Sequence, residues 1–324
     1  MTRAIVLHEP GGPEQLLWEE VSVRDPGPSE LLVRHTAIGV NFHDTYVRSG
    51  SYKTLKLPGI PGVEAAGVVE KVGAEVAAFV PGDRVVYIDQ NYGAYSEKRV
   101  LAASLAFRVP DAMSDEAAAS LAVKGLTACM LLRHTRRVLP EETILIHAAA
   151  GGVGQLLVHW AKHLGARVIA TVGSTEKAKI ARSCGADDVI LYRNENFVER
   201  VESFTHGRGV DVVYDSVGAD TFDGSLQCLG YFGTLVNFGQ SSGPVPPLAI
   251  SRLAARSNTV VRPTIFHYLR ERSARDAMAE ETFKMVLAGV LTPRIGLRVP
   301  LSRASQAHAA LESRSTTGAI ILTV

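Results

Sequence analysis

The sequence predicts an α/β protein with two lobes, a β-rich lobe followed by a doubly wound lobe in which strands and helices alternate. The chain has 324 residues, more than one compact core of ordinary size contains. Residues 1–110 hold short β-branched runs separated by Pro-Gly turns. From residue 143 strand-like and helix-like segments alternate, which is typical of right-handed βαβ units in a parallel sheet.

The first lobe is expected to contain at least four strands and to end in a helix. Its β-branched runs are residues 4–7, 31–38, 65–73 and 83–88. Residues 113–135 are rich in Ala and Leu at helical spacing, and Ser114 is placed to cap that helix because acidic residues follow it.

The second lobe is expected to repeat a strand and a helix several times. The expected strands are residues 143–147, 167–172, 187–192, 210–215 and 233–239, and the expected helices begin near residues 152, 175, 197 and 220. A further helix near 274–289 leads to a final strand at 319–324, and this tail is expected to return to the first lobe.

Composition excludes several classes of protein. Lysine and arginine (34) nearly balance aspartate and glutamate (33), so the net charge of +1 provides no field for nucleic acid or acidic membranes. No apolar run approaches the ~18 residues of a membrane span, and the N-terminus does not resemble a signal peptide. The three cysteines form no CxxC pair. We therefore expect a cytoplasmic protein with a small-molecule partner.

The segment HAAAGGVGQ, residues 147–155, predicts a dinucleotide-binding turn. It lies between a strand and a helix and reads Ala149-x-Gly151-x-x-Gly154, with the first glycine of the usual G-x-G-x-x-G replaced. Such a turn lets a pyrophosphate approach the free N–H groups at the helix start. The residues assigned to it are Ala150, Gly151, Gly152 and Val153. The alternative is a glycine turn that serves close packing alone.

The end of the second strand favours NADP(H) over NAD(H). An NAD site places an acid there to hold the ribose hydroxyls, but residues 171–175 contain none. Gly173, Ser174, Lys177 and Tyr192 are assigned instead to a 2′-phosphate. Arg193 follows Tyr192. The alternative for Lys177 is an ordinary solvated position on a helix.

Taken in order, these motifs resemble the zinc-independent NADPH:quinone oxidoreductases, the zeta-crystallin-like group of the medium-chain dehydrogenase/reductase superfamily. The matching blocks are residues 41–52, 62–73, 81–87, 124–128, 147–154, 212–218, 237–243 and 312–318. The resemblance implies a GroES-like β-barrel domain (1–124 and 263–324), a Rossmann doubly wound parallel-sheet domain (125–262), a cofactor between them and a homodimer. His159 replaces the family's usual glutamine, a change we treat as neutral.

The resemblance also argues against a catalytic metal. The three zinc-ligand positions of the related alcohol dehydrogenases fall at Asn41, at Val63 and near Val123, whereas an open tetrahedral site needs three ligands such as Cys or His. Without a Lewis acid, alcohol oxidation is not expected. Quinones, which accept hydride readily, fit better, and alkenes conjugated to a carbonyl are the alternative.

Further site residues follow from the resemblance alone. Asn41 is expected near the nicotinamide ribose, Thr127 beside the nicotinamide, and Tyr46 and Tyr52 around the acceptor. Loops after the fourth and fifth strands and near the C-terminus complete the cofactor site, with Ser216, Phe238, Gly239, Gln240, Ser241 and Thr317. For each tyrosine the alternative is packing within the barrel.

The expected function is NADPH-dependent, metal-free reduction of quinones, in which the protein orients a planar acceptor against the nicotinamide. Tyr46 is the best candidate for a general acid. Two rivals remain, an alkenal or enone reductase and a non-catalytic NADPH-binding protein with an RNA-binding role. The sequence leaves open the particular acceptor and whether electrons pass singly or in pairs.

Overall fold

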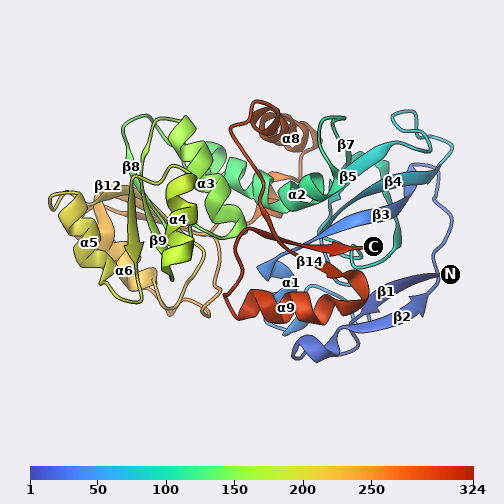
Figure 1. Cartoon of the computed structure of the whole chain (residues 1–324), viewed down its shortest axis with the longest axis horizontal. Helices are drawn as coiled ribbons and strands as arrows, with labels where there is room; N and C mark the ends of the chain where they lie inside the picture. Colours follow the sequence, from blue (N-terminus) through green and yellow to red (C-terminus); the bar gives the residue numbers. More distant parts are fainter. The chain divides into compact units, whose positions relative to one another are not determined.

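The computed structural model describes residues 1–324, which form two compact units (Figure 1). Unit 1 comprises Met1–Gly125 and Pro293–Val324, and unit 2 comprises Leu126–Thr292. The boundary falls inside the long helix α2 (Asp115–Cys129). The Oγ of Ser114 accepts the N–H of Ala117 at 3.2 Å, which confirms the predicted start of this helix.

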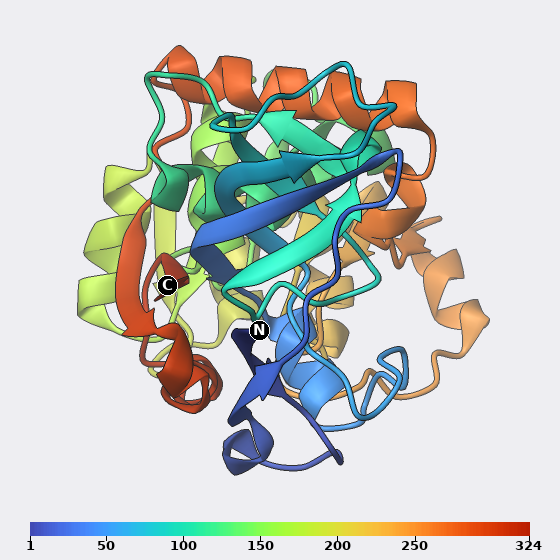
Figure 2. The ribbon, with the colours of Figure 1, turned by 90° about the vertical axis from the view of Figure 1, so that its right-hand side faces the viewer.

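Unit 1 is built on a seven-stranded sheet in the order β14-β15-β3-β4-β5-β7, with β6 paired to β3 (Figure 2). All neighbours are antiparallel except β14 and β15. The strands are β3 (Glu30–Val40), β4 (Glu64–Val72), β5 (Arg84–Ile88), β6 (Lys98–Ala102), β7 (Ala106–Arg108), β14 (Ile295–Pro300) and β15 (Ala319–Thr323). A separate hairpin joins β1 (Thr2–Val6) to β2 (Leu17–Val21).

The C-terminal tail returns to unit 1, as predicted, because its apolar face completes that core. Ile320 and Leu322 of β15 are buried with Ile38 of β3. Two helices cover the same region, α1 (Phe42–Arg48) and α9 (Ala304–Glu312), and the guanidinium of Arg48 pairs with Glu312 across them.

Unit 2 is a six-stranded parallel sheet in the order β10-β9-β8-β11-β12-β13. The strands are β8 (Thr143–Ile146), β9 (Arg167–Val172), β10 (Asp188–Leu191), β11 (Val210–Asp215), β12 (Leu229–Asn237) and β13 (Thr259–Val261). The helices are α3 (Gly152–His163), α4 (Thr175–Ser183), α5 (Phe197–Phe204) and α6 (Phe222–Cys228). This order confirms the doubly wound prediction, and it reverses direction between β8 and β11, where open α/β sheets bind ligands.

The compact units and the predicted domains place residues 263–292 differently, since the chain leaves unit 2 only after Thr292. The intervening α7 (Ile265–Tyr268) and α8 (Arg272–Leu287) have their partners in unit 2. Thr135 donates to the Tyr268 hydroxyl at 3.1 Å, and Arg133 donates to Glu281 at 2.8 Å. The sequence does not show which side chains these helices meet, because the contacts join residues far apart in the chain.

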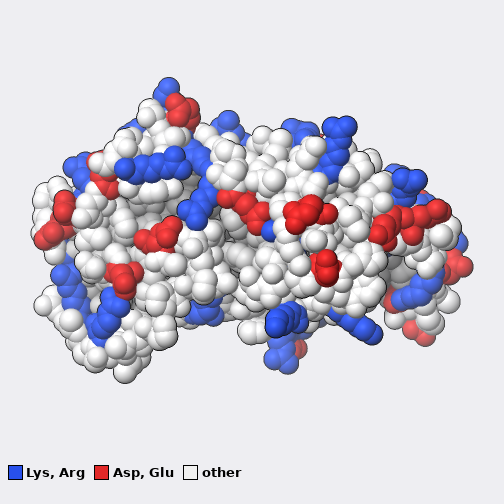
Figure 3. All heavy atoms as spheres, turned by 90° about the horizontal axis from the view of Figure 1, so that it is seen from below, with Lys and Arg blue, Asp and Glu red and all other residues white.

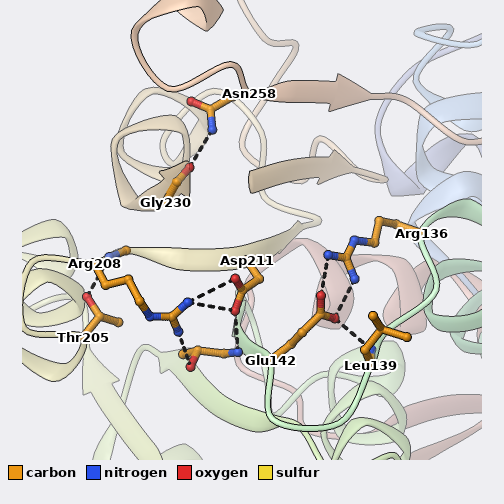
Figure 4. Close-up of polar contacts among 10 residues, drawn as sticks. Arg136, Leu139, Glu142, Thr205, Arg208, Asp211, Gly230 and Asn258 are labelled. Carbon is orange, nitrogen blue, oxygen red and sulfur yellow. Dashed lines mark hydrogen bonds and ion pairs between the residues drawn. The ribbon is translucent and has the colours of Figure 1, made fainter. Parts of the chain in front are cut away.

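Polar contacts join the amino ends of the unit 2 strands (Figure 4). Asp211 accepts from Arg208 at 3.1 Å and from the Thr143 N–H at 2.8 Å, and Arg136 pairs with Glu142 in the loop before β8. A cavity of about 500 Å³ opens at this edge beside Asn258, and no predicted site residue lines it.

Charges of both signs are interspersed over the face drawn in Figure 3. None of the helices combines the length and the apolar character needed to cross a membrane.

Candidate functional site

The glycine turn places the start of α3 directly against the end of β8. Ala148 has a left-handed backbone (φ +52°), and its carbonyl oxygen accepts the Gly151 N–H at 2.9 Å. A Cβ on Gly154 would lie 2.3 Å from that oxygen, so only glycine permits the approach. Because the left-handed position is Ala148, the missing first glycine at Ala149 leaves the turn intact.

The first turn of α3 offers N–H groups to an anion. The helix has 12 residues, and Gly151 before it supplies no side-chain cap. Amides in a first turn lack intrahelical acceptors, and the helix dipole favours negative charge there. The predicted residues Ala150, Gly151, Gly152 and Val153 all lie at this turn.

A buried network ties this turn to neighbouring strands. Asp215, at the end of β11, is fully buried and accepts from the Ser225 hydroxyl at 3.0 Å. That hydroxyl also contacts Nε2 of His147, whose Nδ1 meets the Thr171 hydroxyl at 2.8 Å. Burial lowers the pKa of His147 and keeps the ring neutral. Since Ser225 donates to Asp215, Nε2 of His147 must carry the proton.

The loops after β11 and β12 lie against each other. The Asp215 carboxylate accepts the N–H groups of Val217 and Gly218, and the Ser241 N–H donates to the Ser216 oxygen at 3.2 Å. A Cβ on Gly239 would lie 2.6 Å from the Ser216 oxygen. The structure therefore brings together five residues that the resemblance assigned to the cofactor: Ser216, Phe238, Gly239, Gln240 and Ser241.

Basic and hydroxyl groups gather at the end of β9. A Cβ on Gly173 would lie 2.9 Å from the Tyr192 hydroxyl and 3.5 Å from Nε of Arg193. Ser174 caps α4 through the Lys177 N–H at 3.3 Å. Burial, and then the charge of Arg193, lower the pKa of Lys177, so these two cations lie within electrostatic reach of each other. Gly173, Ser174, Lys177 and Tyr192 thus lie at or just beyond the ends of β9 and β10 in unit 2, and their role toward a phosphate stays a prediction.

Two further predicted cofactor residues have other surroundings. Thr127 is a buried residue of α2, two positions after the unit boundary. Thr317 belongs to unit 1, where its carbonyl oxygen lies so close to Gly296 of β14 that an added Cβ would overlap it. Their roles stay predictions.

In unit 1, Asn41 belongs to a buried polar cluster. Nζ of Lys124 donates to Oδ1 of Asn41 and to Oε1 of Glu64, both at 2.9 Å, while Nδ2 of Asn41 donates to the same Glu64 oxygen at 2.8 Å. Glu64 is fully buried, and Gly39 makes room for it, since a Cβ there would lie 2.1 Å from Oε1. The amide of Asn41 is thereby held in one orientation.

A second buried carboxyl group lies one turn into α1. Asp44 accepts the Asn41 N–H at 2.8 Å and the Tyr95 hydroxyl at 3.1 Å through Oδ2, while its Oδ1 is buried without a hydrogen-bond partner. Burial raises the pKa of Asp44 to about 7. The Tyr95 hydroxyl also contacts Nε2 of His308 at 3.0 Å, and burial lowers the pKa of His308 to about 3.

Tyr46 and Tyr52 form part of an aromatic group beside Asn41. Their ring centroids are 5.1 Å apart with an edge-on geometry, and both side chains are half-buried. His43 contacts Tyr52 edge-on and stacks on Tyr92 at 5.9 Å, and burial lowers the pKa of His43 to about 4. The group offers ring faces and hydroxyls without adding charge.

Two family models match the chain. Residues 27–111 match the alcohol dehydrogenase GroES-like domain, and residues 152–281 match a domain described as zinc-binding dehydrogenase. Among curated proteins, the quinone oxidoreductase of Pseudomonas aeruginosa is 45% identical and quinone oxidoreductase 1 of Escherichia coli is 44% identical. A 2-haloacrylate reductase of a Burkholderia species is 43% identical. Each alignment covers 99% of both chains.

Solved structures agree with these relatives. The E. coli quinone oxidoreductase complexed with NADPH has a TM-score of 0.96 and 44% identity, and the match covers 99% of this chain and 100% of that one. The chain belongs to the quinone oxidoreductase family of medium-chain dehydrogenases/reductases. This confirms the resemblance drawn from the motifs, the GroES-like and Rossmann fold classes, and the expectation of an oxidoreductase.

Within this quinone oxidoreductase family member, the side chains at the zinc-ligand positions do not fit zinc. Val63 has no ligand atom and is fully buried, and Oδ1 of Asn41 already accepts from the Lys124 ammonium. A catalytic zinc takes three nitrogen, sulfur or oxygen ligands from the protein. The side chains at these two positions therefore do not provide the ligands of a catalytic zinc.

Sequence reasoning missed the residues that hold the site in place. Asp215 lies in the VVYDSVG block, and Lys124 begins the KGLTA block, yet neither received a role. Arg262, directly after β13, donates to the carbonyl oxygens of Asn237 and Gly239 at 3.1 and 3.0 Å. A charged residue at the end of an apolar strand was the signal available for Asp215 and Arg262.

Replacing Gly154 by alanine is expected to destabilise unit 2 more than the same change at Gly151. The Cβ at 154 meets backbone at 2.3 Å, whereas at 151 the nearest atom is 3.2 Å away and the backbone is ordinary (φ −77°). Overpacking of this kind lowers the free energy of unfolding by about 1–3 kcal/mol. Urea unfolding of both variants would check this, and equal losses would contradict it.

Asp44 is expected to make stability fall as the pH rises. Its pKa is raised from 3.8 in the unfolded chain to about 7 in the folded protein. The contribution of protonated Asp44 to the free energy of unfolding is therefore complete below about pH 4 and is lost by about pH 7. Relative to Asp44→Asn, the native protein should lose on the order of 4 kcal/mol between these limits.

Urea unfolding at several pH values would measure this difference. Asp111→Asn, at an exposed position of unit 1, serves as the control and should run parallel to the native protein. A difference between native protein and Asp44→Asn that does not change with pH would refute the assignment.

Proposed function

We propose that this protein is an NADPH-dependent quinone reductase that uses no catalytic metal. The observation that carries the proposal is the pairing of a helix-start anion site at Gly151–Gly154 with the cations Lys177 and Arg193 one strand away. Two anion-binding sites of this kind suit the pyrophosphate and the 2′-phosphate of NADPH. The 44% identical E. coli relative whose structure contains NADPH supports it.

The residues present fit this cofactor. Close approach of backbone to a pyrophosphate requires positions without side chains, which Gly151 and Gly152 provide. The Ser174 hydroxyl, the Tyr192 phenol and the Lys177 ammonium are assigned to a phosphate, and residues 171–175 contain no acid, although the Glu176 carboxylate hydrogen-bonds with Ser174. The facing glycine and serine loops, with Ser216, Gly239 and Ser241, are assigned to the nicotinamide half.

When bound, NADPH supplies a hydride to the acceptor. The chain's own residues bind and orient. The Asn41 amide, held by Lys124 and Glu64, is assigned to position the ribose, and Tyr46 and Tyr52 offer ring faces to a planar acceptor. Tyr46 is assigned as the proton donor to the reduced acceptor. Orientation provides most of the rate advantage in this scheme, and the expectation of a homodimer stays a prediction.

A second candidate function is reduction of a carbon–carbon double bond conjugated to a carbonyl or carboxyl group. The 43% identical 2-haloacrylate reductase favours it, because that relative is as similar to the chain as the quinone oxidoreductases are. Neither function requires a Lewis acid when the acceptor is already electron-poor.

Lys177→Ala is expected to weaken NADPH binding at least tenfold while leaving NADH binding within about twofold, because only NADPH carries the 2′-phosphate. Lys179→Ala, at an exposed position of the same helix, is the matched control and should change neither affinity. Titration calorimetry with both nucleotides would measure the effect. Equal loss for the two nucleotides would remove the phosphate role from Lys177.

Steady-state assays with NADPH should show faster turnover of 1,4-benzoquinone and phenanthrenequinone than of a 2-alkenal or 2-chloroacrylate. Tyr46→Phe should lower kcat and leave KM nearly unchanged if the hydroxyl donates a proton and the ring remains in place. A preference for the alkenal or the haloacrylate would favour the second candidate. Tight NADPH binding without turnover of any acceptor would overturn both.

A further inference from the structure

Three side chains of metal-ligand type meet outside the proposed cofactor site. They are Cys129 at the end of α2, His134 in the π-helix η3 (Met130–Thr135) and Glu281 on α8. Their ligand atoms all lie within 4.8 Å of one another. All three belong to unit 2.

The π-helix explains how the first two residues come together. A π-helix repeats its contacts every five residues, and Cys129 and His134 are five residues apart, so both project from one side of the helix. In an α-helix of the same sequence, residues three or four apart would share that side. Isolated π-helical turns are rare and occur frequently at functional sites.

Glu281 presents Oε2 to Cys129 and His134, while its Oε1 accepts a hydrogen bond from Arg133. Nε of Arg133 donates to Oε1 at 2.8 Å, and Oε2 lies 3.7 Å from Sγ of Cys129. Ligands bound tetrahedrally at 2.0–2.3 Å are roughly 3.3–3.8 Å apart, so this pair is already at ligand spacing. Arg133 would orient the carboxylate from outside, as outer partners do in metal sites.

We propose that Cys129, His134 and Glu281 bind Zn²⁺, with water in the fourth position. Sulfur, imidazole nitrogen and carboxylate oxygen form a donor set that zinc accepts. Cys129 is buried while His134 is exposed, so the ion enters from the His134 side, and the free position faces solvent. The site joins η3 to α8 and has no part in the proposed reduction.

Binding must release a proton. The Cys129 thiol is buried beside the Glu281 carboxylate, and sulfur binds a metal only as the thiolate. Zinc replaces that proton on sulfur, and the proton passes to the solvent. Proton release into a weak buffer is therefore a second measure of binding through the thiolate.

Titration of the untagged, full-length protein with Co²⁺, a spectroscopic probe for zinc sites, tests the proposal. We expect one ion per chain, a thiolate-to-cobalt charge-transfer absorption, and its loss when Zn²⁺ displaces cobalt. Cys129→Ser should abolish the absorption, and His134→Ala, a surface change that leaves the core intact, should weaken binding at least tenfold.

Two controls match these variants. Cys184→Ser removes another buried thiol, and His163→Ala removes another exposed histidine of unit 2; both should bind cobalt like the native protein. Quinone or alkenal turnover should change less than twofold in Cys129→Ser, which separates this site from the proposed function. Absence of a thiolate absorption at saturating cobalt, or equal affinity of native protein and His134→Ala, would overturn the proposal.

Discussion

One buried carboxylate, that of Asp215, holds the functional edge of unit 2 together. It accepts from backbone N–H groups that follow β11 and, through the Ser225 hydroxyl, connects to His147 after β8 and Thr171 in β9. A fully buried polar group of this kind is tolerated only when it is well hydrogen-bonded. The network therefore constrains three neighbouring strand ends at once. It thereby also constrains the loops that carry the proposed cofactor residues.

Unit 1 also contains buried polar groups that are held by hydrogen bonds. Lys124 and Glu64 form a buried pair, and Asn41 is hydrogen-bonded to both partners. The Lys124 ammonium thus contacts Asn41, which stands at one of the ligand positions implied by the resemblance. An ammonium can orient an amide, but it cannot activate an alcohol as zinc does. An ammonium at this place therefore suits an acceptor that needs no activation by a metal.

Glycine acts in two distinct ways at the proposed cofactor site. At Gly154 the absence of Cβ lets the helix touch backbone, a contact that no rearrangement of side chains can relieve. At Gly173 it leaves room for the movable end of Tyr192 beside Arg193. The first is a constraint on the fold, and the second shapes the surface that would meet a phosphate.

The sequence by itself determined the two lobes, the alternation of strands and helices in the second lobe, the glycine turn and the residue types around Lys177. These depend on hydrophobic periodicity and local turn chemistry, which act over a few residues. Only the tertiary structure decided that residues 263–292 belong to unit 2, that Lys124 contacts Asn41, and that Cys129 and Glu281 meet. Those contacts join residues that are 83 and 152 positions apart, so they depend on packing between elements and not on local pattern.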